Sequence, residues 1–427
     1  ICEQNHSLTL GDEATKVIVN AEGSRDDLSE NMRSFLDYLI EKKATKEQTE
    51  AITQTEGNIR VASVPGSGKT FVLTYRIAYL ITELFVEPSS IVALTFTNKA
   101  AREMSKRIRQ MIGDSDTGYI CTFHGFCVKL LREDIHAINF PQNFVVMDDE
   151  DTEEILKTVY ENAHIQSRTY TFDSARDHIT ALKSQMLHIP YLAEIGNEKL
   201  LADYEKAEKV EDKVFLGYLY EQKKVYGLDY DDLITIALYI LQTDEMKRIK
   251  WQERMMYVMV DEFQDVSNSQ YALAEILSGY HRNLFIVGDP DQTIYTWRGA
   301  QIEYILEFDE THENTRTIFL DMNYRSTPEI LAVSNSLIEK NKKRLPHRLE
   351  AYKESGRRPI YIHSRTTGDE AQWMTSEIQR LVSEGASYNE MAVLYRSHFV
   401  SRNIEESFIK AKIPYTLYLS LIHISEP

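Results

Sequence analysis

Residues 58–85 constrain the fold of this chain more than any other segment. Residues 58–62 (Asn-Ile-Arg-Val-Ala) have the pattern of a buried strand, residues 63–70 read Ser-Val-Pro-Gly-Ser-Gly-Lys-Thr, and residues 71–85 have the pattern of a helix. Gly66 and Gly68 permit a tight loop whose backbone N–H groups can surround phosphate oxygens at a helix N-terminus. Strand, phosphate loop and helix in this order predict an α/β protein with a parallel sheet.

The loop carries the side chains that a nucleotide and its metal require. Lys69 can reach the terminal phosphates, and Thr70 offers a hydroxyl to Mg²⁺. Ser63 stands where the general pattern has its first Gly, and Pro65 removes one N–H group, so the match is imperfect. We predict that the loop binds ATP and Mg²⁺ through Ser63, Val64, Pro65, Gly66, Ser67, Gly68, Lys69 and Thr70.

A second string, Met-Tyr-Val-Met-Val-Asp-Glu at residues 256–262, is a hydrophobic strand that ends in two carboxylates. A nucleotide bound with Mg²⁺ needs one carboxylate in the shell of the metal and one base near the attacking water. Asp261 suits the first role and Glu262 the second. The alternative is a surface Asp-Glu pair after an ordinary strand, and the phosphate loop upstream favours the catalytic interpretation.

Composition sets the limits of the prediction. A chain of 427 residues corresponds to about two or three domains, each able to bury a core. The 3 Cys form no disulfide framework, which fits a reducing compartment and a cytoplasmic location. Residues 121–127 contain two Cys and one His without a further ligand cluster, so a packed junction is favoured over a metal site. No segment has the pattern of a membrane span.

The formal net charge of −18 argues against a nucleic-acid partner at first sight, because such partners usually meet a basic surface. Binding is local, however, and two segments are rich in cations. Each is more often simply a solvated helix face. The cations are Lys99, Arg102, Lys106, Arg107 and Arg109 in the first segment, and Lys340, Lys342, Lys343, Arg344 and Arg348 in the second.

Aromatic and hydroxyl residues follow three expected strands. Ligands of α/β sheets collect at the carboxyl ends of strands, where aromatic rings can stack on unpaired bases. Taken singly, each ring more often belongs to the core. The same chemistry at three strand ends predicts a binding track for single-stranded nucleic acid. The residues concerned are Thr95 and Phe96, Thr122 and His124, and Tyr295, Trp297 and Arg298.

The order of these strings resembles the UvrD/Rep/PcrA group of superfamily 1 DNA helicases over about residues 45–415. The most specific segment is residues 287–300, with the sequence Val-Gly-Asp-Pro-Asp-Gln-Thr-Ile-Tyr-Thr-Trp-Arg-Gly-Ala. The other matching segments are residues 94–101, 122–124, 260–265 and 323–326, with weaker matches at residues 228–233 and 392–397.

The resemblance implies a role for individual residues. Gln48 would read the adenine edge, Arg76 would lie near the base or ribose, and Tyr324 would stack on the ring. Gln292 and Arg325 would contact the γ-phosphate and, with Lys69 and Glu262, form the catalytic set. Thr95, Phe96, Thr122, His124, Tyr295, Trp297, Arg298 and Arg396 would line the DNA track. The family moves 3′ to 5′ by coupling ATP hydrolysis to stepping. His398 departs from the Asn common in relatives.

The resemblance also implies a domain organisation. Residues 45–147 and 229–329 would form a first RecA-like domain, interrupted by a helical insertion at residues 148–228. Within that insertion, residues 151–163 and 203–226 have helical periodicity. Residues 330–416 would begin a second RecA-like domain with a helix at residues 327–341 and strands at residues 359–363 and 391–395.

Both ends depart from the resemblance. Residues 1–44 form an N-terminal extension, either a genuine accessory segment or a foreign fusion, with an amphipathic helix pattern. Its apolar positions are Leu28, Met32, Phe35, Leu36 and Leu39. Residues 417–427 read as an unrelated tail. We therefore expect a helicase fragment that lacks a second helical insertion and an arginine finger, and whose DNA-stimulated ATP hydrolysis and unwinding are impaired.

Three functions fit these observations. The first is an ATP-dependent DNA helicase or translocase of repair and replication, acting on single-stranded DNA and single-strand/duplex junctions. The second is a helicase subunit that works with repair or nuclease proteins, or within a phage-defence complex. The third is a nucleotide-gated DNA-binding module without motor activity. DNA-stimulated ATP turnover separates the third from the other two.

Overall fold

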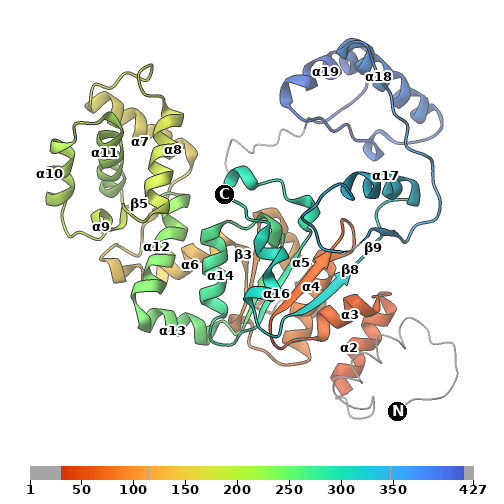
Figure 1. Cartoon of the computed structure of the whole chain (residues 1–427), viewed down its shortest axis with the longest axis horizontal. Coiled ribbons are helices and arrows are strands. Elements are labelled where there is room, and N and C mark those ends of the chain that lie inside the picture. The colour runs from red at the N-terminus through yellow and green to blue at the C-terminus, as the bar shows by residue number, and fades with distance from the viewer. Residues whose placement is uncertain (1–29, 114, 347, 418–427) are drawn as a thin grey trace. The chain divides into compact units, whose positions relative to one another are not determined.

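The computed structural model describes residues 30–113, 115–346 and 348–417 (Figure 1). The chain divides into two compact units, and the division falls between Gly356 and Arg357. Within the described part of the chain, every helix is too short or too polar to cross a membrane. The first unit contains the sheet and is built around the predicted phosphate loop.

The first unit is organised by one parallel sheet with the strand order β3-β2-β6-β7-β1-β8. Side chains alternate between its faces, so that Val92 and Leu94 join one buried cluster while Ile91 and Ala93 join the other. A parallel sheet of this kind is covered on both faces, as its uniformly buried strands indicate. The strands are β1 (Ile59–Ser63), β2 (Ile91–Thr95), β3 (Tyr119–Thr122), β6 (Tyr257–Val260), β7 (Leu284–Gly288) and β8 (Arg316–Leu320).

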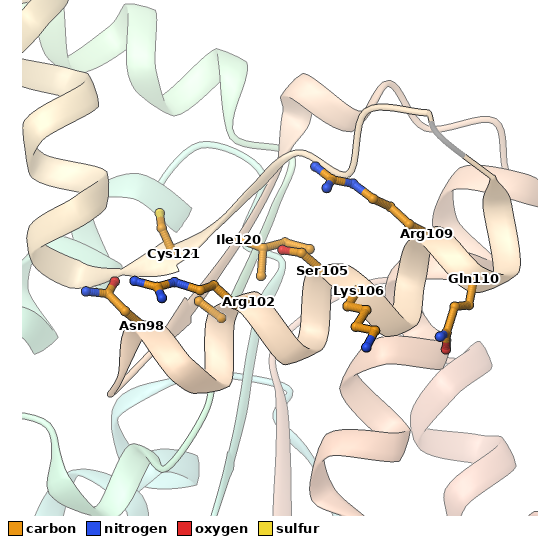
Figure 2. Close-up of a pocket in the computed structure, with 9 residues that line it drawn as sticks. Asn98, Arg102, Ser105, Lys106, Arg109, Gln110, Ile120 and Cys121 are labelled. Carbon is orange, nitrogen blue, oxygen red and sulfur yellow. The ribbon is translucent and has the colours of Figure 1, made fainter.

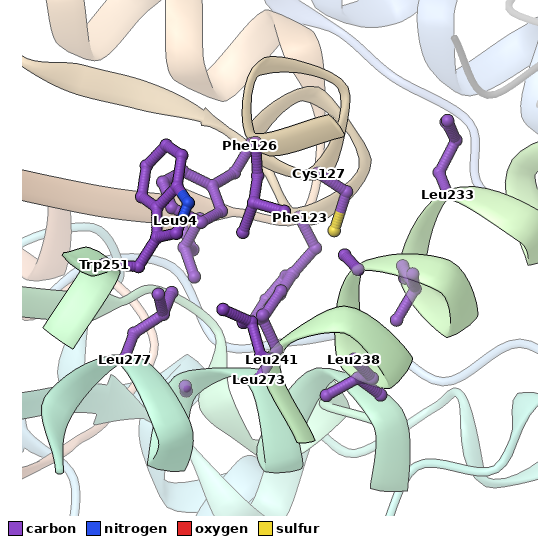
Figure 3. Close-up of a cluster of buried hydrophobic side chains, with 14 of the residues drawn as sticks. Leu94, Phe123, Phe126, Cys127, Leu233, Leu238, Leu241, Trp251, Leu273 and Leu277 are labelled. Atoms are coloured by element: carbon purple, nitrogen blue, oxygen red, sulfur yellow. The ribbon is translucent and has the colours of Figure 1, made fainter. Parts of the chain in front are cut away.

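One face of the sheet is covered by α6 (Phe123–Asp134), α12 (Tyr230–Thr243), α13 (Glu245–Arg254) and α14 (Asn268–Ser278). Figure 3 shows this cluster, in which Phe123 extends toward Leu241 and Leu273, while the ring of Phe126 lies 5.6 Å from that of Trp251. Trp251 is fully buried and donates from Nε1 to Asp134 Oδ2 at 2.7 Å. A large aromatic ring is accommodated here because its one polar group has a partner.

The opposite face is covered by α2 (Glu30–Glu41), α3 (Lys46–Thr53), α4 (Lys69–Thr82) and α5 (Asn98–Ile112). Phe35 and Leu39 of α2 are buried, and the ring of Phe35 lies 5.3 Å from that of Tyr79 in α4. The described part of the predicted N-terminal extension is thus packed into the core of the first unit. Leu28 and the side chain of Met32 lie outside the described residues.

A helical insertion begins after β4 (Val145–Val146) and ends at β5 (Gly227–Leu228). These two short strands pair in parallel and form a sheet of their own, separate from the six-stranded sheet. Figure 1 shows its helices as a cluster beyond α12. The sequence predicts one helix over residues 203–226, whereas the structure has α10 and α11. The two helices pack side by side, so the chain must reverse between them. The insertion comprises α7 (Asp149–Asn162), α8 (Phe172–Ser184), α9 (Ile189–Leu192), α10 (Glu198–Lys206) and α11 (Val210–Lys224).

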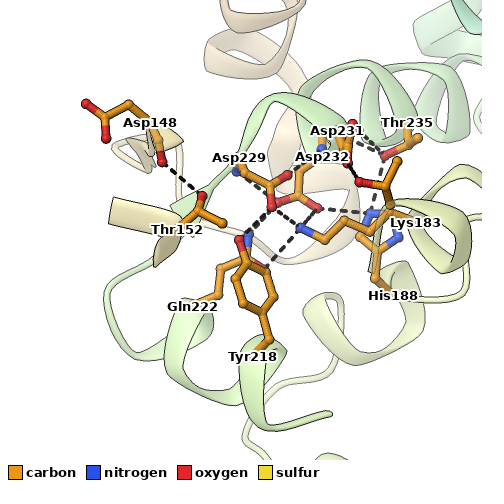
Figure 4. A network of polar contacts seen from close by, with 11 residues as sticks. Asp148, Thr152, Lys183, His188, Tyr218, Gln222, Asp229, Asp231, Asp232 and Thr235 are labelled. Atoms are coloured by element: carbon orange, nitrogen blue, oxygen red, sulfur yellow. Dashed lines mark hydrogen bonds and ion pairs between the residues drawn. The ribbon is translucent and has the colours of Figure 1, made fainter. Parts of the chain in front are cut away.

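A buried ion cluster joins this insertion to α12 (Figure 4). Lys183 of α8 is fully buried, and its ammonium lies 2.5 Å from Asp229 Oδ2 and 2.8 Å from Asp232 Oδ1. Tyr218 of α11 donates its hydroxyl to Asp229 Oδ2 at 2.7 Å. Burial and the charge of Asp229 raise the pKa of Asp232 to about 7, while burial lowers the pKa of His188 to about 3. The cluster fixes α8 and α11 against the start of α12.

Two short helices, α15 (Glu303–Leu306) and α16 (Phe308–Thr311), precede β8, and after β8 the chain leaves the six-stranded sheet. β9 (Met322–Asn323) pairs in parallel with β10 (Glu350–Ala351), and α17 (Pro328–Ile338) lies between them in sequence. This connection keeps residues 322–326 beside the phosphate loop.

The second unit contains α18 (Thr367–Ser383) and α19 (Ser401–Lys410), whose contact buries Ala371, Ile404 and Phe408. The sequence predicts strands at residues 359–363 and 391–395, and this prediction is wrong for the structure. Neither segment pairs with another strand among the described residues, and a strand exists only through such pairing. Tyr361 and Leu394 are correspondingly 86 % and 93 % exposed.

Candidate functional site

The phosphate loop lies between β1 and α4, where the sequence predicts it. Gly66 (φ 68°) and Gly68 (φ 93°) both have left-handed backbone conformations. A Cβ added to Gly66 would lie 2.8 Å from Arg325 Cβ, and one added to Gly68 would lie 2.8 Å from Gln48 Nε2. The positive φ therefore favours glycine at both positions, and at Gly66 the nearby Arg325 Cβ also leaves no room for a side chain.

The carboxylate pair lies at the same edge of the sheet as this loop, directly after β6, which is separated from β1 by β7. Asp261 extends the strand by donating its backbone N–H to Leu94 O at 2.9 Å. Glu262 has a left-handed conformation (φ 49°), which is unusual for a residue with a side chain and is often found at functional sites. Its Oε2 lies 2.8 Å from Lys69 Nζ. Burial and the neighbouring charge of Glu262 raise the pKa of Asp261 to about 7.

The residues around the loop suit a nucleotide held with Mg²⁺. Gly66 and Gly68 leave a cradle that a Cβ would fill, and the Ser67 hydroxyl is buried without a hydrogen-bond partner in the described residues. Thr70 and Asp261 would supply oxygen ligands, which Mg²⁺ prefers while retaining water and phosphate oxygens in its shell. In the described ranges no three His, Cys, Asp or Glu side chains gather as a metal site. Magnesium bound mainly through a nucleotide needs no such cluster.

Residues 323–326 are attached to the phosphate loop. Asn323 Nδ2 donates to Pro65 O at 2.5 Å, and the backbone N–H of Tyr324 donates to Gly66 O at 3.0 Å. Asn323 Oδ1 also accepts the backbone N–H groups of Arg325 and Ser326, at 2.8 and 2.7 Å. The buried amide of Asn323 thus holds the phosphate loop and the backbone of Arg325 in fixed positions relative to each other.

The residues expected near the base occupy three different environments. Gln48 is buried and donates from Nε2 to Ser67 O at 2.9 Å, so it contacts the phosphate loop itself. Arg76 is fully buried, donates to the backbone carbonyls of Ala51, Gln54 and Thr55, and has its pKa lowered to about 9 by burial. The ring of Tyr324 is half-buried, 4.9 Å from that of Tyr352. Contacts of all three with adenine or ribose stay predictions.

A continuous chain of hydrogen bonds runs from the carboxylate pair to the end of β7. Gln264 Nε2 donates to Glu262 Oε2 at 3.0 Å and to Asp265 Oδ2 at 3.1 Å, and its Oε1 accepts from Asp289 N at 2.9 Å. Gln292 Nε2 then donates to Asp289 Oδ2 at 2.6 Å. A Cβ on Gly288 would lie 2.5 Å from Gln264 Oε1, so this close passage requires glycine at residue 288.

The aromatic residues predicted for the DNA track form one group. The rings of Phe96 and Tyr295 stack at 4.7 Å, and that of Trp297 lies 6.3 Å from Tyr295. The Arg298 guanidinium lies 4.8 Å from the Trp297 ring. Trp297 is 63 % exposed, whereas the strand residue Phe285 is 1 % exposed. The core alternative is therefore wrong for Trp297.

The hydroxyl and imidazole residues of the track lie on the two neighbouring strand ends. Thr95 donates its hydroxyl to Thr97 O at 3.1 Å, and Thr122 caps α6 by accepting the Gly125 N–H at 3.1 Å. Burial lowers the pKa of His124 to about 4, so this imidazole is neutral at physiological pH. Its ring meets that of Tyr230 edge-on at 5.4 Å.

The structure brings most of the predicted residues of the first unit together at the carboxyl ends of the strands, whereas Arg76 packs on the ring of Phe285 near the start of β7. Arg325 lies against Gly66, and Gln292 lies on the loop that carries Tyr295. Arg396 is exposed in the second unit and so belongs to a different compact body.

Sequence reasoning assigned no role to Asn323, Gln264 or Asp289, although all three occur inside the matching segments. The three are buried polar residues with several hydrogen bonds each. The only sequence signal for such residues is a polar side chain within or directly after an apolar strand. This signal indicates a buried hydrogen bond but does not reveal which residue is the partner.

The fold and this site define a P-loop protein of the RecA-like α/β class. Residues 44–313 match the UvrD/REP helicase N-terminal domain, and residues 318–421 match the UvrD-like helicase C-terminal domain. The chain therefore belongs to the UvrD/REP helicase family, a family of ATP-dependent DNA helicases.

Several curated relatives carry the name ATP-dependent DNA helicase PcrA. The protein of Staphylococcus aureus strain Mu50 is 38 % identical over 372 residues, which is 87 % of this chain and 50 % of the relative. That of Staphylococcus epidermidis strain ATCC 12228 is 38 % identical over 377 residues, covering 88 % and 51 % respectively. The chain thus spans about half the length of these curated relatives.

Proposed function

We propose that this chain carries the ATP-hydrolysing half of a DNA helicase that moves 3′ to 5′ on single-stranded DNA. The observation that supports this function best is the hydrogen-bond chain from Glu262 through Gln264 and Asp289 to Gln292. It ends on the same loop as Tyr295 and Trp297. A change at the nucleotide can therefore move the rings on which bases stack.

The proposed chemistry assigns one task to each group. The loop N–H groups and Lys69 hold the phosphates, Thr70 and Asp261 hold Mg²⁺, and Glu262 orients and deprotonates the attacking water. When bound, Mg²⁺ neutralises charge that develops on the phosphate oxygens. The Lys69–Glu262 ion pair links two of these tasks. When the Lys69 ammonium binds a phosphate instead of Glu262, the Glu262 carboxylate becomes free to contact the attacking water.

The remaining site roles are proposed from the family pattern together with position. Arg325 and Gln292 contact the γ-phosphate and respond to its loss. Gln48, Arg76 and Tyr324 form or support the adenine site. Phe96, Tyr295 and Trp297 stack on bases, while Thr95, Thr122, His124, Arg298 and Arg396 contact the DNA strand.

We also propose a domain division for the described chain. Residues 45–147 and 229–329 form the first RecA-like domain, and residues 148–228 form the insertion that the Lys183 cluster attaches to α12. Residues 330–416 form part of a second RecA-like domain. Because α2 packs on α4, we include residues 35–44 with the first domain.

Steady-state ATP hydrolysis, measured with and without oligo(dT), tests the proposal. We expect ATP–Mg²⁺ binding that Lys69→Ala weakens at least about tenfold, since a charge-assisted phosphate contact is lost. Lys157→Ala, at an exposed ion-paired lysine of α7, is the matched control. DNA that changes neither nucleotide affinity nor turnover would overturn the motor function. Directional unwinding of 3′-tailed against 5′-tailed duplexes, measured with a protein that extends this chain to the full length of its relatives, tests polarity.

A further inference from the structure

A groove of about 610 Å³ lies away from the nucleotide site, between α5 and β3 (Figure 2). Its wall is one face of α5, which presents Arg102, Lys106 and Arg109 at a helical spacing of four and three residues. Ile120 and Cys121 of β3 lie beside them and are only half-buried. The groove therefore combines a basic wall with a largely apolar floor.

Within the structurally described ranges, no carboxylate forms an ion pair with any of the three cations of this wall, Arg102, Lys106 and Arg109. On the same helix, Arg107 pairs with Glu103 and does not line the groove. In a chain with 66 acidic and 48 basic side chains, a row of unpaired cations beside a groove favours an anionic ligand.

The floor of the groove indicates which kind of anionic ligand fits. β3 is the terminal strand of the sheet, so one of its edges has no strand partner among the described residues. Such an edge can pair with the backbone of an extended peptide. The groove lining contains no aromatic side chain, whereas sites for single-stranded nucleic acid depend on aromatic stacking. Both observations favour a peptide over a nucleic acid.

The spacing of the cations matches an extended peptide. Along a helix, Arg102 and Lys106 are separated by about 6 Å of rise and Arg102 and Arg109 by about 10 Å. Alternate residues of an extended chain lie about 6.6 Å apart on one face. The spacing of acidic side chains at alternate positions therefore matches that of Arg102 and Lys106, and Arg109 lies about 3 Å short of the next such position along the helix axis. The intervening side chains of the peptide lie toward the apolar floor.

We propose that the groove between α5 and β3 docks an extended acidic segment of a partner protein. Acidic side chains at alternate positions pair with Arg102, Lys106 and Arg109, and the segment runs beside the open edge of β3. The inference does not depend on motor activity, because the groove shares no residue with the proposed nucleotide or DNA contacts.

The test uses a fluorescein-labelled peptide of five Val-Glu repeats and measures fluorescence anisotropy with the full chain. The control probes are a peptide of five Val-Lys repeats and a ten-nucleotide oligo(dT). The test variant is Arg102→Ala/Lys106→Ala/Arg109→Ala. The matched control is Arg107→Ala, on the same helix outside the groove. Circular dichroism melting and ATP–Mg²⁺ binding report whether each variant is folded.

We expect the Val-Glu peptide to bind and the triple variant to lose about tenfold in affinity, the size expected for three solvent-screened charge contacts. Arg107→Ala should bind the peptide as the unchanged protein does, and the Val-Lys peptide should not bind. Absence of peptide binding, or equal binding by the triple variant, would overturn the proposal. It would also be overturned if the triple variant lost affinity for oligo(dT) and not for the peptide.

Discussion

Among the proposed DNA contacts, Trp297 has the environment that best supports a role in base stacking. It is exposed, it lies beside Tyr295 and Arg298, and its loop is joined through Gln292 to the carboxylate network. An exposed indole contributes little to the stability of a core, so its replacement separates binding from folding. Phe96, which stacks on Tyr295, is half-buried and contributes to both.

Trp297→Ala should weaken binding of oligo(dT) by about 1–3 kcal/mol, the range found for base–aromatic stacking, and leave the melting temperature nearly unchanged. Phe96→Ala should weaken binding similarly and also lower the melting temperature. Tyr280→Ala, at another exposed ring, is the control and should bind normally. Anisotropy titration and thermal unfolding measure both quantities. A Trp297→Ala protein that melts early and binds normally would show that the ring is structural.

At the residue scale, the sequence predicts functional side chains that belong to one continuous motif. Lys69 and Glu262 are recognisable because a phosphate loop and a strand-end carboxylate pair are continuous strings. Their 2.8 Å contact, by contrast, depends on the folded sheet, in which β7 alone separates β1, which precedes Lys69, from β6, which precedes Glu262. Asn323 and Gln264 could not be assigned for the same reason, since their partners lie on other segments.

At the scale of elements, Gln264 connects the end of β6 with the end of β7. Gln264→Leu keeps the size of the side chain and removes all three of its hydrogen bonds. We expect it to reduce the effect of an ATP analogue with Mg²⁺ on oligo(dT) affinity, an effect typically worth about 1–3 kcal/mol. Gln252→Leu, at a glutamine bonded to Ile276 O, is the control. If Gln264→Leu keeps the full nucleotide effect, the coupling path lies elsewhere.

The Lys183 cluster is the second feature at this scale. Lys183→Met should destabilise the chain by about 3–5 kcal/mol, because it leaves the buried carboxylates of Asp229 and Asp232 without their cation. Lys157→Met removes an exposed ion pair and should cost less than about 1 kcal/mol. Urea unfolding followed by circular dichroism measures both values. Equal stability of the two variants would mean that the buried cluster contributes little.

Helices and strands were predictable from the sequence where the pattern that defines them lies within a single segment. The strand and helix around the phosphate loop agree with β1 and α4 within a few residues, because burial and periodicity are read directly from sequence. Residues 359–363 and 391–395 have a strand-like composition, yet pairing requires a neighbour that composition does not reveal. The break between α10 and α11 likewise follows from the packing of one helix on the other.

At the scale of the whole molecule, the formal charge of −18 opposes the approach of DNA, so the proposed DNA binding must depend on a few local contacts. Stacking by Phe96, Tyr295 and Trp297 is insensitive to salt. His124 adds no charge, because its pKa is lowered to about 4 by burial. Among the proposed contacts, only Arg298 and Arg396 are permanent cations.

The affinity for oligo(dT) should therefore fall only weakly with salt. Each neutralised single-strand phosphate contributes a slope of about −0.7 to the plot of log affinity against log salt concentration, so we expect a total between about −1 and −3. Arg298→Ala should reduce the slope by about 0.7, Trp297→Ala should lower affinity at constant slope, and His124→Asn should leave the slope unchanged. Titrations from 50 to 200 mM salt measure it. A slope steeper than about −5 would mean that further cations, such as those of residues 340–348, also hold DNA.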